Sequence, residues 1–509
     1  MKQGHSYIEV GTALAERKTG VFRCTAAQEP LDSCQRPGQP VPPASVGLAK
    51  KVSDPRNYSR AAVTLEPVGS AETRYDEASP VDPGTPADGP HSRVRERPEV
   101  TGKTWRRCIR ALLGRRRVSG NEDAYVAMQH TEHAALSTAG EQTERLILDG
   151  TKMAWHTDRV RAWERGERFA PITVDMALTR ACNYACGFCY AMLQENDRQL
   201  ITRDVMYRFL DDCAEIGVKG ISLVSDGEST LSPAFMATVK RGDELGISMA
   251  SGTNGFIFNR TKLEEILPHL TYLRINFSAG TRERYAEIMG VKPEAYDRVV
   301  QNIRDMVEIK RRRNLPVTIG MQMVLMPQDA DQILPYARLG KELRPDYAVI
   351  KHCSDDEDSN LGVDYDGYAK LYDLLAEAEA LSDDEYQVVV KWSKIKADGA
   401  RSYQRCYGAP FILQISGSGL VAPCGMLFNE RYKKFHIGNI VEQSFKDIVC
   451  GDRYWEVMSY LASPHFNAQT MCGTLCLQHC VNQYLDEYRK GRLELVTPSS
   501  APPKHLNFV

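Results

Sequence analysis

Apolar and polar residues follow two alternating periods between residues 172 and 353. Short strand-like runs rich in Val, Ile and Met are followed by stretches whose apolar residues recur every three to four positions, as in an amphipathic helix. The strand-like runs are 172–178, 220–225, 246–252, 273–278, 317–325 and 347–353. The helical stretches are 203–216, 232–245, 261–267, 293–312 and 329–342. Consecutive β-α units predict an α/β fold with a parallel sheet, closed or partly closed as a barrel.

Residues 1–120 show neither period and are rich in Pro, Gly, Ser, Ala and charged side chains. Such a composition buries too little apolar surface to offset the entropy of ordering, so we expect a disordered tail. Its most basic part, 93–117, is interpreted as a solvated segment, with contact to phosphate or to a partner as the alternative. A helical lead-in is predicted at 121–167, before Pro171.

The alternation of strands and helices stops near residue 398, where a region rich in Cys and Gly begins. We therefore expect a core barrel at 168–398, a separate small module at 399–490 and a C-terminal tail at 491–509. A chain of 509 residues has room for this number of domains.

The charge and the cysteine content limit the class of protein. The formal net charge is −2, so no overall field favours nucleic acid or an anionic membrane as a partner. The longest uncharged run, 406–429, is interrupted by Gly417, Gly419 and Pro423 and makes a poor membrane span. The first residues lack the apolar core of a signal peptide, so the 14 cysteines indicate a reducing, cytoplasmic location.

Three cysteines stand close together in "TRACNYACGFCYA", at positions Cys182, Cys186 and Cys189. They could ligate zinc, hold an iron–sulfur cluster or be packed thiols. Structural zinc sites use four protein ligands, whereas a four-iron cluster held by three thiolates keeps one iron open to a small molecule. The triplet follows the first predicted strand, at the end of a barrel where active sites lie.

The sequence "CNYACGFCY", with Phe188 before the third cysteine, resembles the signature loop of the radical S-adenosylmethionine (SAM) superfamily. The resemblance implies a partial (β/α)6 barrel over about 168–355. It further implies that Cys182, Cys186 and Cys189 hold a [4Fe-4S] cluster whose open iron chelates SAM. Members of this family cleave SAM reductively to a 5′-deoxyadenosyl radical, which abstracts hydrogen from a substrate.

Further motifs follow in the order that the family shows. "SDGEST" resembles the family's G-G-E element, with Asp226 in place of the first glycine. The strand ends "SGTNG" and "INFSAG" resemble those that contact the ribose and methionine parts of SAM, and "MQMVLMP" could add one polar contact. The resemblance thus implies these SAM-binding residues: Phe188, Asp226, Gly227, Glu228, Asn254, Asn276, Ser278 and Gln322.

Cys353 would lie at the catalytic end of the sixth strand, outside any cluster motif. It could donate a hydrogen atom to a substrate radical, as a cysteine does in some epimerases of the superfamily. It could also be an additional cluster ligand or a buried bystander. The neighbouring His352, Asp355, Asp356 and Asp358 could hold a polyhydroxylated or cationic substrate, or form a solvated acidic loop.

The C-terminal module resembles the SPASM or twitch extension of radical SAM enzymes. Cys406, Gly419 and Cys424 fit the C-x12-G-x4-C pattern, and Cys472, Cys476 and Cys480 follow in "CGTLCLQHC". A full SPASM module has seven cysteines and two clusters. This region has six, of which Cys450 lies in no motif position, so we predict one auxiliary [4Fe-4S] cluster. Its ligands would be Cys406, Cys424 and two of the last three, with His479 as an outside candidate. A zinc site on the same thiolates is the alternative.

The resemblance leaves the substrate open. We expect a small, carbohydrate-like molecule that is epimerised or oxidised, with a reductant such as flavodoxin or ferredoxin as the electron donor. A SPASM-type peptide or protein maturase is the first alternative. A non-catalytic metal-binding interaction protein is the second.

Overall fold

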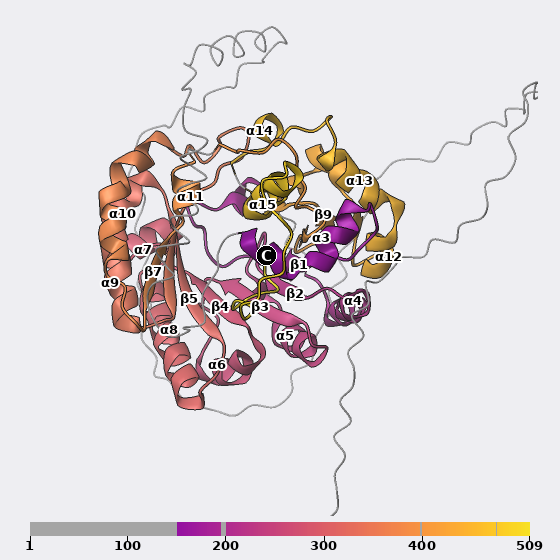
Figure 1. The fold of residues 1–509 in the computed structure, drawn as a ribbon. Helices are drawn as coiled ribbons and strands as arrows, with labels where there is room; N and C mark the ends of the chain where they lie inside the picture. Colours follow the sequence, from indigo (N-terminus) through magenta and orange to yellow (C-terminus); the bar gives the residue numbers. More distant parts are fainter. Residues whose placement is uncertain (1–149, 195–199, 398–399, 475) are drawn as a thin grey trace, which may run out of the picture. The chain divides into compact units, whose positions relative to one another are not determined.

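The computed structural model describes residues 150–194, 200–397, 400–474 and 476–509. Its central feature is a ten-stranded sheet in the order β10-β9-β8-β1-β2-β3-β4-β5-β6-β7 (Figure 1). Neighbouring strands from β1 to β7 pair in parallel, as repeated β-α units require. These strands are β1 (Thr173–Met176), β2 (Gly220–Leu223), β3 (Ser248–Thr253), β4 (Tyr272–Asn276), β5 (Thr318–Leu325), β6 (Tyr347–His352) and β7 (Gln387–Val390).

Helices connect the strands and cover the outside of the sheet. They are α4 (Arg203–Ile216), α5 (Phe235–Glu244), α6 (Arg260–Ile266), α7 (Arg282–Met289), α8 (Glu294–Arg313), α9 (Ile333–Leu343), α10 (Tyr372–Glu379) and α11 (Trp392–Ile395). In α4 the side chain of Thr202 accepts a hydrogen bond from the Val205 amide, and Gly217 ends the helix at φ 85°. Both termini are therefore fixed by local chemistry.

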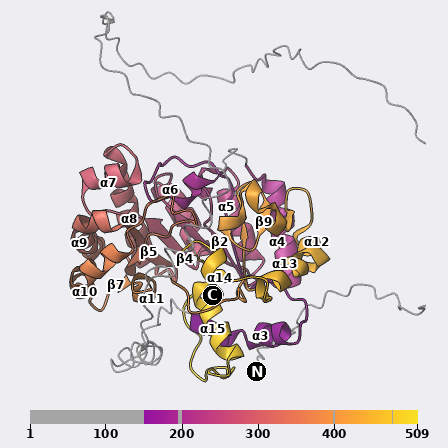
Figure 2. The same cartoon turned by 90° about the horizontal axis from the view of Figure 1, so that it is seen from above.

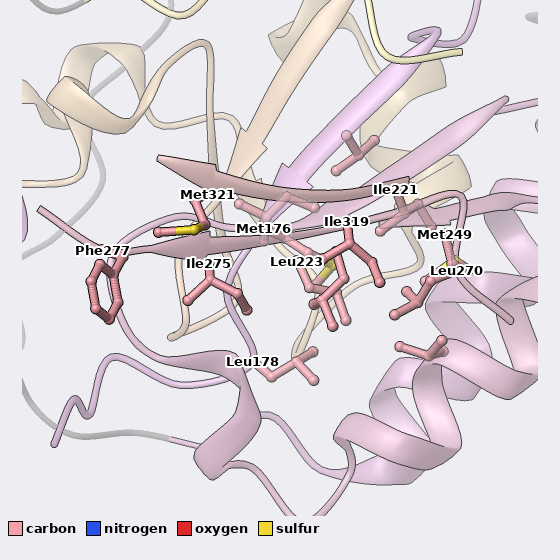
Figure 3. Close-up of a cluster of buried hydrophobic side chains, with 14 of the residues drawn as sticks. Met176, Leu178, Ile221, Leu223, Met249, Leu270, Ile275, Phe277, Ile319 and Met321 are labelled. Carbon is pink, nitrogen blue, oxygen red and sulfur yellow. The ribbon is translucent and has the colours of Figure 1, made fainter. Parts of the chain in front are cut away.

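The hydrophobic core lies between the strands and these helices. Because side chains alternate along a strand, one set of residues from β1 to β5 points outward into an apolar cluster. Figure 3 shows labelled members of this cluster: Met176, Leu178, Ile221, Leu223, Met249, Leu270, Ile275, Phe277, Ile319 and Met321. The intervening residues, among them Asp175, Ser222 and Arg274, face the lumen of the partial barrel.

The cysteine-rich region continues the same sheet. Strand β8 (Ile412–Ile415) pairs in parallel with β1, and β9 (Leu420–Ala422) and β10 (Gly438–Asn439) follow as antiparallel neighbours. The helices after this hairpin are α12 (Phe445–Cys450), α13 (Asp452–Ala462), α14 (Ala468–Met471) and α15 (His479–Arg489). Figure 2 shows α12 and α13 on the side opposite α9 and α10.

The C-terminal residues close the lumen at the amino ends of the strands. The Asn507 carbonyl accepts a hydrogen bond from Thr173 Oγ1 (2.8 Å), and its side-chain amide donates to Ser248 Oγ (2.9 Å). The rings of His505 and Phe508 each lie 5.0 Å from that of Tyr272. The C-terminal residues therefore cover the amino ends of β1, β3 and β4.

The structure confirms the predicted α/β fold and a partial barrel of the predicted strands. The prediction missed α7 altogether. Of the lead-in, a 3-10 helix (Gly150–Trp155) and α3 (Thr157–Glu164) are described. The predicted tail 1–120 lies outside the described residues, and the domain bounds remain predictions. In the described part of the chain, no helix is long and apolar enough to cross a membrane.

Candidate active site

The three-cysteine loop follows β1 at the open end of the lumen. Cys182 is exposed, and Cys186 and Cys189 are partly buried. Burial raises the pKa of Cys182 to about 11, with Glu228 and Cys189 adding to the rise. For Cys186 burial is again the largest cause, followed by the charges of Cys189 and Cys182. The three thiols are thus close enough to act on one another, as common ligands of one cluster must be.

Within the described ranges, no three Cys, His, Asp or Glu side chains converge closely enough to hold a single metal ion. A four-iron cube makes a different demand, because each thiolate binds a separate iron. The loop 182–189 offers three grouped thiols from one turn-sized segment. This donor set fits a cube with one iron open to another ligand.

The backbone just before the loop is packed against two glycines. A Cβ on Gly227 would lie 2.0 Å from the Thr179 carbonyl oxygen, and one on Gly417 would lie 2.2 Å from the Thr179 carbonyl carbon. No side chain fits at either contact. The turn after β2 and the hairpin turn after β8 therefore both need glycine where they touch the start of the cysteine loop.

Asp226 ties these two turns to the same backbone. Its carboxylate lies 3.2 Å from Arg180 Nε and accepts hydrogen bonds from Ser416 Oγ (2.6 Å) and the Gly417 amide (2.9 Å). Burial raises the pKa of Asp226, and these hydrogen bonds oppose the rise. Sequence reasoning missed Arg180 and Ser416 because only the fold brings these distant segments together.

Glu228 is buried in the same turn and its carboxylate accepts several hydrogen bonds. Thr230 donates from its amide and hydroxyl, Thr253 from its hydroxyl at 2.8 Å, and the Asn254 amide at 2.7 Å. The Asn254 side chain in turn donates to Asn183 Oδ1 in the cysteine loop (2.8 Å). The network fixes the end of β3 against the loop.

The other predicted SAM-binding residues lie on the next two strands. Gln322 on β5 donates to Asn276 Oδ1 on β4 (3.0 Å). Ser278 Oγ accepts a hydrogen bond from the Val324 amide (3.1 Å). With Glu228 and Asn254, these side chains lie along the carboxyl ends of β2 to β5.

Cys353 follows β6 and approaches the cysteine loop. Its thiol lies 3.9 Å from the Phe188 carbonyl oxygen, and its amide is held by the Tyr368 hydroxyl (2.9 Å). Burial, followed by the charge of Asp355, raises the pKa of the Cys353 thiol to about 12. The thiol is therefore protonated at neutral pH.

In the acidic loop after Cys353, Asp355 and Asp356 accept hydrogen bonds from within the loop, whereas Asp358 pairs with Arg431 of the C-terminal region (2.8 Å). Asp355 Oδ1 accepts from the Asp356 and Leu361 amides (2.8 and 2.9 Å). Asp356 accepts from the amide and side chain of Asn360. His352 is buried beside the rings of Tyr365 and Tyr368 and forms none of these hydrogen bonds.

Four cysteines of the C-terminal module form a second group. Burial is the main cause that raises the pKa of Cys406, to about 12, and the next causes are Cys476 and Cys472. The pKa of Cys424 is raised by burial and then by Cys472, Cys406 and Cys476. Cys480 lies in the first turn of α15, and His479 donates to or accepts from the Tyr403 hydroxyl (3.2 Å). The structure thus brings together Cys406, Cys424, Cys472 and Cys476.

Two family models match the chain. Residues 176–339 match the Radical SAM superfamily, and residues 406–480 match the SPASM iron-sulfur cluster-binding domain. Both sets of cysteines described above fall inside the matched ranges or at their ends.

Curated relatives are distant. A probable GTP 3′,8-cyclase of Saccharolobus islandicus is 23% identical over 169 residues, which are 33% of this chain and 52% of the cyclase. An AdoMet-dependent heme synthase of Methanosarcina barkeri is 24% identical over 303 residues, which are 55% of this chain and 82% of the synthase. The chain spans about half the length of the cyclases, at 52%.

Solved structures resemble the fold at low identity. SuiB of Streptococcus suis bound to precursor peptide SuiA aligns with a TM-score of 0.48 and 16% identity, covering 74% of this chain and 87% of SuiB. Native anSMEcpe with bound AdoMet aligns with a TM-score of 0.43 and 14% identity, covering 62% of this chain and 95% of that one.

The family models and the grouped thiols define two cofactor sites. The first takes a [4Fe-4S] cluster and SAM, and the second takes auxiliary iron-sulfur. The chain therefore carries a radical SAM domain at residues 176–339, followed by a SPASM domain at residues 406–480.

Proposed function

We propose that the protein is an enzyme that cleaves SAM reductively and abstracts hydrogen from a small, carbohydrate-like substrate in the lumen. The observation that carries the proposal is the position of the loop 182–189. The loop follows the carboxyl end of β1 and its three thiols act on one another, whereas the described C-terminal residues cover the opposite ends of β1 and β3. When bound there, the cluster and SAM supply the one-electron cleavage that starts radical chemistry.

The residues of the chain have separate roles in this proposal. Cys182, Cys186 and Cys189 hold the first cluster, and the polar side chains along β2 to β5 orient SAM. Asn254 fixes the loop through Asn183. The C-terminal residues exclude water from the floor of the lumen, which protects reactive intermediates.

We propose that Cys353 gives a hydrogen atom to the substrate radical that remains after hydrogen abstraction. Its S–H bond breaks as a substrate C–H bond forms, leaving a thiyl radical on Cys353. One electron and one proton restore the thiol. A reductant such as flavodoxin or ferredoxin supplies the electron, and Cys406, Cys424, Cys472 and Cys476 would hold the auxiliary cluster that passes it on. The elevated pKa of the thiol and its position beside Phe188 support this role.

Anaerobic reconstitution tests the cleavage. The reconstituted protein, given SAM and dithionite, should form 5′-deoxyadenosine, and C186A should form none. C213A is a matched control, because Cys213 is buried in α4 away from the loop. A non-catalytic metal-binding protein would form no 5′-deoxyadenosine in any of the three.

Substrate turnover in deuterated solvent tests Cys353. A metabolite trapped from cell extract should gain one deuterium with the parent protein, and C353A should cleave SAM without label in the product. If the product formed by C353A contains as much deuterium as that of the parent protein, Cys353 is not the hydrogen donor. If the trapped molecule is a peptide, the maturase alternative replaces the carbohydrate-like substrate.

A further inference from the structure

The lumen contains two cationic side chains that the SAM-binding residues do not include. Arg274 lies on β4 and Lys351 on β6, at positions that alternate with the outward-facing Ile275 and Ile350. Both therefore face the lumen. Both are only partly covered by the protein, because they border this open interior.

Small neighbours leave room for Arg274. In the sheet register it stands between Gly252 on β3 and Gly320 on β5. A Cβ on Gly252 would lie 3.2 Å from Arg274 Nη2. The guanidinium therefore lies beside β3. On the other side, a Cβ on Gly320 would lie 2.3 Å from the ring of Tyr347, so this ring occupies the space next to Gly320.

Lys351 lies nearer the open end than Arg274, because it pairs with Val324 on β5, four positions after the Gly320 that pairs with Arg274. Burial lowers the pKa of Lys351 to about 7, and the charge of Arg274 is the next cause. Lys394 and Lys391 lower it further, whereas Cys353 opposes them. The charge of Arg274 thus disfavours the charged form of Lys351, and an anion between the two side chains would relieve this repulsion.

The described protein groups do not neutralise this pair. Among the residues that the structure describes, the side chains of Arg274 and Lys351 form no hydrogen bond or ion pair, and Arg274 Nε is buried without a hydrogen-bond partner. Asp175 on β1 is a carboxyl on which the charge of Arg274 acts; burial raises its pKa to about 7, and Arg274 opposes the rise. A single carboxyl on β1 does not balance two cationic side chains.

We propose that Arg274 and Lys351 bind an anionic group of the substrate, a carboxylate or a phosphate, in the lumen below the cysteine loop. The inference rests on the proposed function for the identity of the ligand as substrate. Arg274 can donate two hydrogen bonds in a fixed plane and Lys351 adds a point charge, a combination suited to either anion. Asp175 opposes binding, because it competes for Arg274.

The carboxylate of SAM is the other source of the same chemistry. Lys351 pairs in the sheet with Val324, whose amide donates to Ser278, one of the predicted SAM-binding residues. Lys351 could therefore contact either SAM or the substrate, and an experiment must separate the two. Arg274 precedes Asn276 by two positions on β4 and so lies nearer the floor of the lumen. Its depth favours the substrate.

Titration calorimetry on the reconstituted holoenzyme saturated with SAM tests the proposal, with inorganic phosphate and succinate as probes. R274Q and K351Q should each weaken binding of at least one probe tenfold or more, and K351R should restore most of it. D175N should strengthen binding, which loss of folding cannot imitate. R338Q is the matched control, because Arg338 is exposed and its ion pair with Glu377 is long, at 3.9 Å.

A parallel titration with SAM alone separates the two sources. Unchanged SAM affinity in R274Q and K351Q supports a substrate site, whereas a tenfold loss would assign the cations to the SAM carboxylate and overturn the proposal. Probe binding that is equal in all variants would also overturn it. The titrations need no SAM cleavage, so their outcome is independent of the 5′-deoxyadenosine measurement that tests the proposed function.

Discussion

Arg180 and Asp226 form an ion pair that is almost completely buried, with 3.2 Å between Nε and Oδ2 and side-chain exposures of 9% and 4%. Arg180 stands two residues before Cys182, and Asp226 follows β2. Because Asp226 also accepts hydrogen bonds from Ser416 and Gly417, one carboxylate joins the cluster loop, the barrel and the C-terminal hairpin.

Removal of this carboxylate should destabilise the fold. In D226A the buried guanidinium of Arg180 loses its counter-charge, and two hydrogen-bond donors lose their acceptor. Breaking such a buried pair costs about 3–5 kcal/mol. Urea unfolding should show this loss in D226A and a smaller one in D226N, which keeps an acceptor. E342A breaks an exposed pair and should cost less than about 1 kcal/mol. Equal midpoints for D226A and E342A would contradict the argument.

Substitution of the two contacting glycines should affect the first cluster specifically. In G227A and G417A the new Cβ would overlap the Thr179 carbonyl group, so the segment leading to Cys182 must move. Iron content after reconstitution should fall by about four atoms per chain, the content of one cube. G187A is the control inside the same loop, because its Cβ would meet no atom closer than 4.0 Å. Full iron content in G227A and G417A would show that the contacts are not needed.

The second group of thiols makes a separate prediction about iron. Replacement of Cys406, Cys424, Cys472 or Cys476 by Ser should remove about four irons and leave SAM binding in place. C480S should keep its iron, because we assign the cluster to the four other thiols. If C480S loses iron and C472S or C476S does not, the ligand assignment is wrong.

His505 should make stability depend on pH. Burial lowers its pKa to about 3, and Lys152 and Lys504 act in the same direction. The unfolded chain therefore binds a proton near pH 6.5 that the folded chain excludes, and stability falls as pH drops from 6.5 towards 3. H505Q should reduce this slope by up to about 1.4 kcal/mol per pH unit. The exposed His465 provides the control H465Q.

Unfolding midpoints between pH 4.5 and 7.5 would measure the effect. A slope for H505Q equal to that of the parent protein would show that His505 is solvated and that the C-terminal residues do not close the lumen tightly.

The regular elements of the barrel could be predicted because each carries its own local signal. Helix α4 spans the predicted residues 203–216, since Thr202 caps one end and Gly217 ends the other. Helix α7 was missed because its apolar face is short, with Tyr285, Ile288 and Met289 buried among charged residues. Its tertiary contacts, which include the ring pair of Phe277 and Tyr285 (4.5 Å), have no local signature.

For the candidate site, too, some features could be predicted from the sequence and others depend on the fold. The cysteine spacings predicted both groups of thiols, because ligands of one cluster must lie within a short reach. The pairing of β8 with β1 and the contact between Asp226 and Ser416 join segments about 190 residues apart or more, and no periodicity encodes them. Arg274 and Lys351 have no distinguishing signal in the sequence, because only the fold brings both side chains to one lumen.

The central claim is that Cys182, Cys186 and Cys189 hold a cluster whose open iron binds SAM. The most direct measurement is the electron paramagnetic resonance spectrum of the anaerobically reduced C406S/C424S protein, which isolates the first cluster, with and without SAM. We expect a [4Fe-4S]⁺ signal whose g values shift when SAM is added, and no such signal once C186A is also introduced. A cluster signal that SAM leaves unchanged, or one that persists with C186A, would contradict the account.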